Sequence, residues 1–343
     1  MAGLLDKLKK NSKIDGVSSL EKSKFYAPKN QITTNVPAIN LALSGSLNGG
    51  LMSGLTLIAG PSKHFKSSIC LVMAAAFQKA NPDGVVLFYD SEFGSPAEYF
   101  KAYGVDPERV LHTPITDIEQ LKFDIMSQLD GLEKDDKVLI LIDSIGNLAS
   151  KKEVEDALNE KSAADMTRAK QLKSLFRMVT PHLTIKNVPM LAICHVYQTQ
   201  ELYAKTVISG GTGLLYSAND AWVISRSQEK DGTDLIGYTF TINIEKSRTL
   251  KERSKIPLTV TFGGGINRWS GLLDIALELG FVVKPSNGWY QRVDPETGEV
   301  QEQKYRAKDT ETAEFWELLL ASKEFAAAVE KQYRLNVVNN DEI

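Results

Sequence analysis

One segment constrains the fold of this 343-residue chain more than any other: Gly60-Pro61-Ser62-Lys63-His64-Phe65-Lys66-Ser67. It matches the pattern G-x-x-x-x-G-K-[ST] except at Phe65, which stands where the pattern has its second glycine. In that pattern backbone amides hold the phosphates of a nucleotide, the lysine reaches the β- and γ-phosphates, and the hydroxyl group binds Mg²⁺. We therefore expect a phosphate-binding loop formed by Gly60, Ser62, Lys63, His64, Phe65, Lys66, Ser67 and Ser68.

The runs on either side of this segment support that interpretation. Residues 55–59 form an apolar run of strand length, and residues 67–77 form an apolar run of helical length. A strand, a loop and a helix in this order direct backbone amides and the helix N-terminus toward a bound anion. The alternative is an ordinary strand-to-helix turn that carries a surface lysine.

Composition limits the class of protein. The chain is 43% hydrophobic and 24% charged, which is ordinary for a soluble globular protein, and no apolar run is as long as a membrane span. The start is charged and amphipathic without a signal-peptide core, and Cys70 and Cys194 form no metal or disulfide pattern. We therefore expect an intracellular protein in a reducing compartment, with no membrane partner. The net charge of −3 indicates that any nucleic acid is bound through a local surface or by many copies together.

Apolar runs further along the chain predict an α/β core. Three near-continuous runs are typical of strands buried on both faces of a mostly parallel sheet: 85–89, 137–142 and 190–194. Three later runs alternate more and predict antiparallel edge strands: 221–224, 238–242 and 258–262.

The same patterns divide the chain into three parts. Residues 1–30 are polar and lysine-rich, with too little apolar material for a core, so they form either a loose tail or an arm that docks elsewhere. Residues 31–268 hold the α/β core. Residues 269–343 predict a small C-terminal α/β domain with a hairpin, its turn at 294–298, and three helices: 272–279, 311–320 and 323–333.

Two carboxylates follow predicted buried strands and belong at the same edge of the sheet. Asp143 ends the run 138–142, and a carboxylate at that place holds the hydration shell of Mg²⁺ in phosphate-loop ATPases. Glu92 follows the run 85–89 and is expected to face the crevice that holds Lys66, because ligands collect at the carboxyl ends of parallel strands. A carboxylate there orients and deprotonates the water that attacks the γ-phosphate. The alternative is an exposed loop acid.

The ordered set of motifs resembles the RecA family of recombinases and, within it, the subgroup of T-even-type bacteriophages. A phenylalanine in the phosphate loop is a trait of that subgroup. The resemblance spans about residues 20–335 and implies a RecA-like ATPase core with an N-terminal oligomerisation arm and a small C-terminal domain. The motifs that carry it are the phosphate loop, Phe88–Gly94, Val138–Lys152, Gly210–Gly213 and Asp274–Pro285.

The resemblance implies roles for individual residues. Glu92 matches the family's catalytic base, and Tyr99 matches its adenine-stacking residue. Lys246 and Arg248 match a pair of cations that reach into the neighbouring subunit's ATP site, where they stabilise transition-state charge. The alternatives, judged from the residues alone, are that Tyr99 is a packing residue on a helix face and that the two cations lie on a solvated strand edge.

His195 stands where bacterial relatives carry a glutamine that senses the γ-phosphate and leads into the second DNA-binding loop. A histidine there is able to donate a hydrogen bond to phosphate, with a strength that varies with pH near neutrality. The alternative is a histidine satisfied by local contacts.

The resemblance also implies two DNA-binding loops, at residues 151–164 and 196–213. Neither is a basic patch, and each by itself reads as a solvated connection. We expect recognition of the DNA backbone and of stacked bases by many subunits acting together, with little sequence preference. The candidate DNA ligands are Lys151, Lys152, Lys161, Arg168, Tyr197, Tyr203, Lys205, Gly210, Gly211 and Thr212.

Together with the nucleotide-site residues, the resemblance implies an ATP- and Mg²⁺-dependent recombinase that forms a helical filament on single-stranded DNA and pairs it with homologous double-stranded DNA. Its other expected partners are a recombination mediator and a single-strand-binding protein, and its expected location is the cytoplasm, that of the host cell for a phage protein. The alternatives are a RecA-fold helicase without strand exchange and a regulatory ATP-binding protein without a DNA partner.

Overall fold

The computed structural model describes residues 3–25, 31–133, 136–159, 167–199 and 206–335. It divides into two compact units, residues 1–31 and residues 32–343, which are described separately below.

In the first unit, residues 3–25 and 31 are described, and they include the α-helix α1 (Leu4–Asn11) and the short 3₁₀-helix η1 (Leu20–Lys22). α1 exposes Leu4, Leu5 and Leu8, and none of the unit's described residues is buried. The described residues of this unit therefore form no hydrophobic core of their own.

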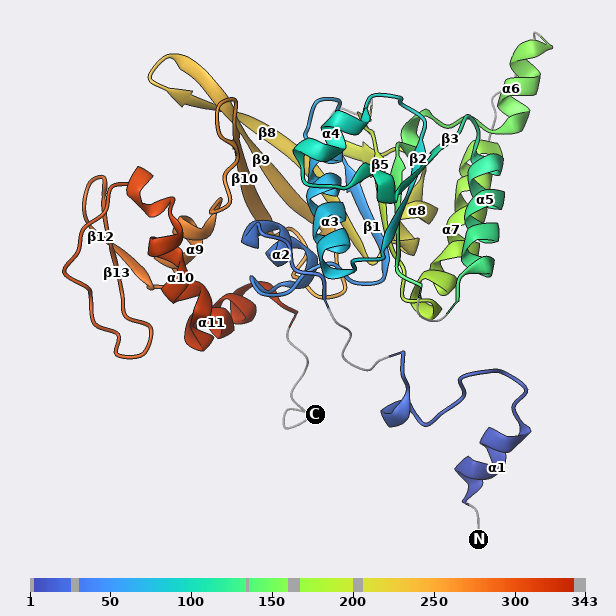
Figure 1. Cartoon of the computed structure of the whole chain (residues 1–343), viewed down its shortest axis with the longest axis horizontal. Coiled ribbons are helices and arrows are strands. Elements are labelled where there is room, and N and C mark those ends of the chain that lie inside the picture. Colours follow the sequence, from blue (N-terminus) through green and yellow to red (C-terminus); the bar gives the residue numbers. More distant parts are fainter. Residues whose placement is uncertain (1–2, 26–30, 134–135, 160–166, 200–205, 336–343) are drawn as a thin grey trace. The chain divides into compact units, whose positions relative to one another are not determined.

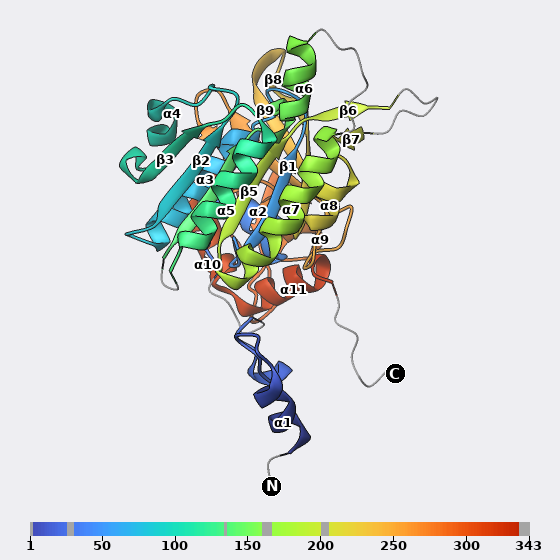
Figure 2. The same cartoon turned by 90° about the vertical axis from the view of Figure 1, so that its right-hand side faces the viewer.

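The second unit is built on a nine-stranded sheet with the order β11-β10-β9-β8-β1-β5-β4-β2-β3 (Figures 1 and 2). The strands from β8 to β3 in that order pair in parallel, whereas β8, β9, β10 and β11 pair antiparallel. The predicted mostly parallel sheet with antiparallel strands toward one edge is thus confirmed. The strands are β1 (Gly54–Ala59), β2 (Val85–Asp90), β3 (Val110–Pro114), β4 (Val138–Asp143), β5 (Pro189–Cys194), β8 (Asp220–Asp231), β9 (Asp234–Lys246), β10 (Lys255–Thr261) and β11 (Gly265–Ile266).

Helices cover both faces of this sheet, with α3 on one side and α5 and α7 on the other (Figure 1). β1 shows why its sequence is apolar throughout: Leu55 and Leu57 join one core cluster, and Ile58 joins the cluster on the opposite face. The helices of this core are α2 (Pro37–Ser44), α3 (Lys66–Ala80), α4 (Ala97–Ala102), α5 (Ile118–Gly131), α6 (Lys151–Leu158), α7 (Thr167–Ile185) and α8 (Thr212–Ser217), with the 3₁₀-helices η2 (Pro107–Arg109) and η3 (Ile145–Asn147).

The segment after residue 268 packs against the α2–α3 side of the sheet. Phe315, Trp316 and Phe325 belong to the same buried cluster as α3, and Arg334 Nε donates to the Ser44 carbonyl at 3.2 Å. Its division from the core stays a prediction. Its elements are α9 (Leu272–Glu278), β12 (Val282–Ser286), β13 (Trp289–Arg292), η4 (Lys308–Thr310), α10 (Ala313–Ala321) and α11 (Lys323–Tyr333).

The turn predicted at 294–298 is present: Gly298 N–H donates to the Asp294 carbonyl, and the residues on either side bridge antiparallel at Val293–Val300 and Tyr290–Tyr305. The sequence analysis missed an earlier hairpin, in which β12 and β13 are joined by a turn at residues 287–288, where Gly288 has a φ of 75°. Of the helices within the described ranges, none has the length and apolar character that crossing a bilayer requires.

Candidate nucleotide-binding site

The phosphate loop lies at the carboxyl end of the parallel strands. β1 ends at Ala59, α3 begins at Lys66, and β5 ends beside β1, with Ala59 opposite Cys194. β2 and β4 end in register, with Asp90 opposite Asp143. A cavity of about 250 Å³ opens there. It is lined by Ile193, by the predicted base Glu92 and by every predicted nucleotide ligand except Gly60, namely Ser62, Lys63, His64, Phe65, Lys66, Ser67, Ser68, Tyr99, Asp143 and His195.

Asp143 and Ser67 form the centre of a candidate Mg²⁺ site. Ser67 Oγ donates to Asp143 Oδ2 at 2.6 Å, while Asp143 Oδ1 is buried without a hydrogen-bond partner among the described residues. Burial, together with the charges of Glu92 and Asp90, raises the pKa of Asp143 to about 6 against the opposing effects of the Ser67 hydroxyl and the Lys66 charge. A hydroxyl and one carboxylate fit a magnesium ion that takes its remaining ligands from phosphate and water. The described residues contain no group of three or more His, Cys, Asp or Glu side chains arranged to hold a metal.

Lys66 lies inside the loop rather than in solvent. Its Nζ donates to the Pro61 carbonyl at 2.8 Å, and its side chain is buried. Burial lowers the pKa of Lys66, whereas the negative charges of Glu92 and Asp143 raise it. The ammonium group is therefore held where the loop curves around an anion.

Glu92 is held by two side chains at the mouth of the cavity. Its Oε1 accepts hydrogen bonds from Ser144 Oγ and from His195 Nε2, the latter at 3.0 Å. A Cβ on Gly146 would lie 2.4 Å from His195 Cδ2, so the histidine ring occupies its place only because residue 146 is glycine. The sequence analysis missed Ser144 and Gly146 as site residues, although Ser144 directly follows Asp143.

Phe65 adopts the backbone conformation that the pattern's second glycine would adopt. Its backbone has a φ of 60° and a ψ of 17°, the left-handed conformation that glycine adopts without strain. Its ring stacks on Phe240 at 5.1 Å between centroids and meets Tyr103 edge-on at 6.4 Å. The ring thus joins the hydrophobic cluster beside α3, as expected for a side chain that packs away from the phosphates.

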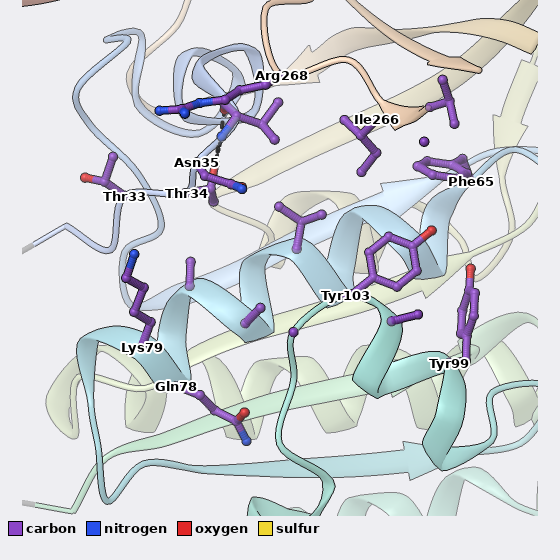
Figure 3. Close-up of a pocket in the computed structure, with 18 of the residues that line it drawn as sticks. Thr33, Thr34, Asn35, Phe65, Gln78, Lys79, Tyr99, Tyr103, Ile266 and Arg268 are labelled. Atoms are coloured by element: carbon purple, nitrogen blue, oxygen red, sulfur yellow. Dashed lines mark hydrogen bonds between the residues drawn. The ribbon is translucent and has the colours of Figure 1, made fainter. Parts of the chain in front are cut away.

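Tyr99 lies near the phosphate loop at one end of a groove of about 980 Å³ (Figure 3). Its hydroxyl group is hydrogen-bonded to Ser68 Oγ, and its ring lies 5.2 Å from that of Tyr103. Burial raises the pKa of Tyr103 to about 12. The sequence analysis missed Tyr103, although a residue four positions after Tyr99 shares its helical face.

Substitutions at Phe65 separate its two effects. Phe65→Ala should destabilise the protein by about 2 kcal/mol, because it removes the ring contacts and keeps a Cβ in a left-handed conformation. Phe65→Gly should lose the same contacts but be about 1 kcal/mol more stable than Phe65→Ala, because glycine relieves the backbone strain. Thermal unfolding followed by circular dichroism measures both. Equal stability of the two variants would contradict the strain argument.

Lys246 is engaged within its own chain. Its Nζ donates to three carbonyls at the end of α8, those of Leu215, Tyr216 and Ala218, at 3.0, 2.9 and 2.7 Å. Arg248, two residues on, is exposed. The two cations predicted to act together therefore differ, because the Lys246 ammonium group is bound to carbonyls of its own chain whereas the Arg248 side chain is exposed.

Asp220 anchors the strand end from which these cations project. It is buried at the start of β8, and its Oδ1 accepts from Ser247 Oγ at 2.6 Å. Burial raises the pKa of Asp220 to about 6, opposed by the Ser247 hydroxyl and by the charges of Arg248 and Lys246.

The raised pKa of Asp220 predicts a pH-dependent stability. The ordinary aspartate pKa is about 3.9, so the folded state prefers the protonated form, and ionisation costs stability as the pH rises from about 4 to 6. Asp220→Asn should therefore raise the free energy of unfolding at pH 7.5 by on the order of 1–3 kcal/mol, and this gain should vanish near pH 4. Urea unfolding at several pH values measures it, with the exposed Asp234→Asn as the control. A gain that is independent of pH would contradict the assignment.

The first candidate DNA segment is not a loop throughout. Residues 151–158 form α6, which begins with a capping box between Ser150 and Glu153. Lys151 and Lys152 are exposed on this helix, and Lys152 pairs with Asp156 at 3.6 Å. Arg168 instead donates to the carbonyls of Ile145, Gly146 and Leu148 at 2.8–3.1 Å, so it fixes the segment after Asp143. Lys161 lies outside the described residues.

The second candidate segment begins and ends in regular structure. β6 (Val196–Gln198) and β7 (Thr206–Ile208) pair antiparallel, and α8 begins at Thr212. α6 and this hairpin project at the same end of the unit (Figure 2). Tyr197 and Thr212 are exposed, and Gly210 and Gly211 have φ values of 113° and 80°, which few other residues adopt. Tyr203 and Lys205 lie outside the described residues.

The fold and the cavity are those of a phosphate-loop nucleotide-binding protein, in which parallel strands end at the loop, a buried aspartate and a glutamate. Comparison with known proteins identifies the family within this class. The RecA N-terminal domain matches residues 4–267, and the C-terminal domain of the bacteriophage T4 recombination and repair protein matches residues 269–329. The chain belongs to the RecA family of recombinases.

Individual relatives agree with this assignment. The recombination and repair protein of Enterobacteria phage T4 is 52% identical over 347 residues, which cover 100% of this chain and 89% of that protein. Protein RecA of Streptomyces venezuelae is 27% identical over 80% of this chain and 71% of its own length. Protein RecA of Nocardioides sp. is 26% identical over 78% of this chain and 75% of its own length. The chain is thus similar to both phage and bacterial members, and the helicase alternative is not favoured.

Proposed function

We propose that this protein is an ATP-dependent recombinase that assembles on single-stranded DNA and exchanges it into a homologous duplex. The observation that carries the proposal is the convergence of Lys66, Ser67, Glu92 and Asp143 on one cavity in a chain of the RecA family. Together they supply a cation for phosphate, a candidate Mg²⁺ site and a carboxylate poised near the loop.

ATP and Mg²⁺ are the proposed ligands of the cavity. Lys66 binds the β- and γ-phosphates, and Ser67 and Asp143 hold Mg²⁺, with Asp143 acting through water. The metal neutralises phosphate charge when it is bound. Tyr99 stacks on the adenine, and Glu92 accepts a proton from the attacking water while Ser144 and His195 orient its carboxylate.

Hydrolysis in this proposal requires a second subunit. Arg248 of one subunit reaches the ATP of its neighbour and stabilises charge on the transferred phosphoryl group. Lys246 joins it only after its ammonium group leaves the carbonyls at the end of α8. Because α8 follows Gly210 and Gly211, this exchange connects the neighbour's nucleotide to a DNA-binding segment.

DNA binding in this proposal depends on the assembled filament. α6 and the β6–β7 hairpin line the DNA, where Lys151, Lys152, Tyr197 and the backbone amides of Gly210–Thr212 contact phosphates and bases. A mediator and a single-strand-binding protein are further proposed partners, in the cytoplasm of a host cell.

The arm, residues 1–30, is proposed to link subunits by docking on the core of the next copy. The edge strand β3 has unpaired backbone groups, and beside it lies an apolar pocket of about 320 Å³ lined by Phe88, Phe93, Pro96 and Phe100. Phe25 is the aromatic side chain of the described arm that fits such a pocket.

Deleting residues 1–30 should abolish filaments and leave a folded monomer, because none of the arm's residues from 3 to 25 is buried. Electron microscopy on single-stranded DNA with ATP and a thermal melt of the truncated protein measure the two effects. Phe25→Ala should weaken assembly in the same direction, whereas Leu20→Ala in the same arm serves as a matched control. Unchanged filaments after deletion would refute the docking role.

Strand exchange between a single-stranded circle and a homologous linear duplex tests the function as a whole. The expected result is ATP hydrolysis stimulated by single-stranded DNA together with ATP-dependent exchange. Unwinding of a forked duplex without exchange would indicate a helicase instead. Hydrolysis that does not respond to DNA would indicate a regulatory ATP-binding protein.

A further inference from the structure

The last residue of β2, Asp90, is a carboxylate outside the predicted set of site residues. It is only 3% exposed, so both of its oxygens need donors. Oδ1 accepts from the backbone N–H groups of Glu92 at 3.0 Å and Phe93 at 2.8 Å. Oδ2 accepts from His112 Nε2 at 3.2 Å.

The two backbone hydrogen bonds fix the turn that presents Glu92. Phe93 has a φ of 55°, a left-handed conformation that costs a residue with a Cβ free energy. A charge-assisted hydrogen bond to its N–H offsets that cost. Without the Asp90 carboxylate, the backbone N–H groups of Glu92 and Phe93 would lose their acceptor. The Glu92 side chain would then no longer be held in one position.

His112 extends this arrangement to the surface of the sheet. It lies on the edge strand β3 with about half of its side chain exposed, and its ring packs 5.4 Å from that of Phe88. His112, Asp90 and Phe93 all line the apolar pocket beside β3. One chain of contacts therefore runs from that pocket through Asp90 to the peptide of Glu92.

We propose that Asp90 is a positioning residue for Glu92, and that His112 holds the Asp90 carboxylate in the orientation this requires. The inference rests on the proposed function, in which Glu92 is the base for ATP hydrolysis. If the arm of a neighbouring subunit binds in the apolar pocket beside β3, it contacts the residues that position Glu92 and so affects ATP hydrolysis in the subunit whose pocket it occupies. The competing explanation is that Asp90 only terminates β2 and contributes to folding.

Two substitutions at Asp90 distinguish these explanations. Asp90→Ala removes the acceptor, so the kcat of DNA-stimulated hydrolysis should fall about tenfold or more, while the KM for ATP stays within about twofold, because Lys66, Ser67 and Tyr99 are untouched. Asp90→Asn keeps Oδ1 as an acceptor for both N–H groups. Its Nδ2 amide group donates to His112 Nε2 when the histidine carries its proton on Nδ1. It should therefore recover kcat to within about threefold of the original chain.

Variants of His112 test the second half of the proposal. His112→Gln keeps a donor to Asp90 and should retain kcat, whereas His112→Phe keeps the ring contact with Phe88, loses the donor and should lower kcat severalfold. Light scattering on single-stranded DNA is recorded for each variant, so that kcat is compared at equal assembly. If Asp90→Ala does not fold, the contrast between His112→Gln and His112→Phe decides the question.

Several outcomes would overturn the inference. They are an unchanged kcat in Asp90→Ala, equal losses in the alanine and asparagine variants, and a raised KM in place of a lowered kcat. Equal kcat in the two His112 variants at equal assembly would remove His112 from the proposal. The original chain is assayed in parallel. If it shows no DNA-stimulated hydrolysis, the proposed function itself is wrong; if it does, the outcomes above count against the role of Asp90 alone.

Discussion

Glu92→Gln should lower DNA-stimulated ATP hydrolysis by about 100-fold or more, while ATP binding and assembly on DNA persist. Glutamine keeps the length of the side chain and an Oε1 acceptor, so the hydrogen bonds from Ser144 Oγ and His195 Nε2 survive. What the variant loses is the capacity to accept a proton from the attacking water. Phosphate release measures turnover, and a fluorescent ATP analogue and light scattering measure binding and assembly.

The matched control for this variant is Glu98→Gln, a change of the same chemistry at an exposed position on α4. It should hydrolyse ATP at the rate of the original chain. Turnover at that rate in Glu92→Gln would remove Glu92 from the role of base. Loss of ATP binding together with turnover would instead assign Glu92 a part in shaping the loop.

The core of the site could be predicted from the sequence because it depends on local pattern and on one rule of α/β sheets. The phosphate loop is contiguous in the chain, and parallel strands end at one edge of the sheet, so Glu92 and Asp143 had to face Lys66. The structure brings these side chains to one cavity. The family resemblance added Tyr99 and His195, which line the same cavity.

Other features depend on partners that are distant in the sequence and carry no local signal. Arg168 looked like a DNA ligand, but its guanidinium meets the carbonyls of Ile145, Gly146 and Leu148, about 20 residues earlier. Lys246 meets carbonyls at the end of α8, about 30 residues earlier. The sequence shows that a residue is cationic, but it does not show which backbone carbonyls will accept hydrogen bonds from its side chain.

α6 is a different kind of miss, because its signal was present. Ser150 and Glu153 have the spacing of a capping box, and the residues that follow are strong helix formers. The family resemblance favoured the interpretation of that stretch as a DNA-binding loop. The local pattern at the N-cap was the better guide, and it places Lys151 and Lys152 in the first turn of a helix.

Arg248→Ala should also lower DNA-stimulated hydrolysis by about 100-fold or more, but for a reason that lies in the neighbouring subunit. Arg248 is exposed, so its loss should leave the affinity of the monomer for ATP unchanged and lower the melting temperature only slightly, through the lost attraction to the buried Asp220 carboxylate. Lys246→Ala is the less clean variant, because it also removes the ammonium group that caps α8. Arg177→Ala, at an exposed position on α7, is the control for loss of an arginine.

A mixture of two inactive variants tests whether the site is shared between subunits. Arg248→Ala supplies an intact Glu92, and Glu92→Gln supplies an intact Arg248. In random filaments of equal amounts, about a quarter of the interfaces pair these two intact groups across one ATP, so about a quarter of the original activity should return. Sites that are complete within one subunit would return none of it. No recovery in filaments shown by light scattering to contain both variants would therefore place the catalytic cation in the same chain as Glu92.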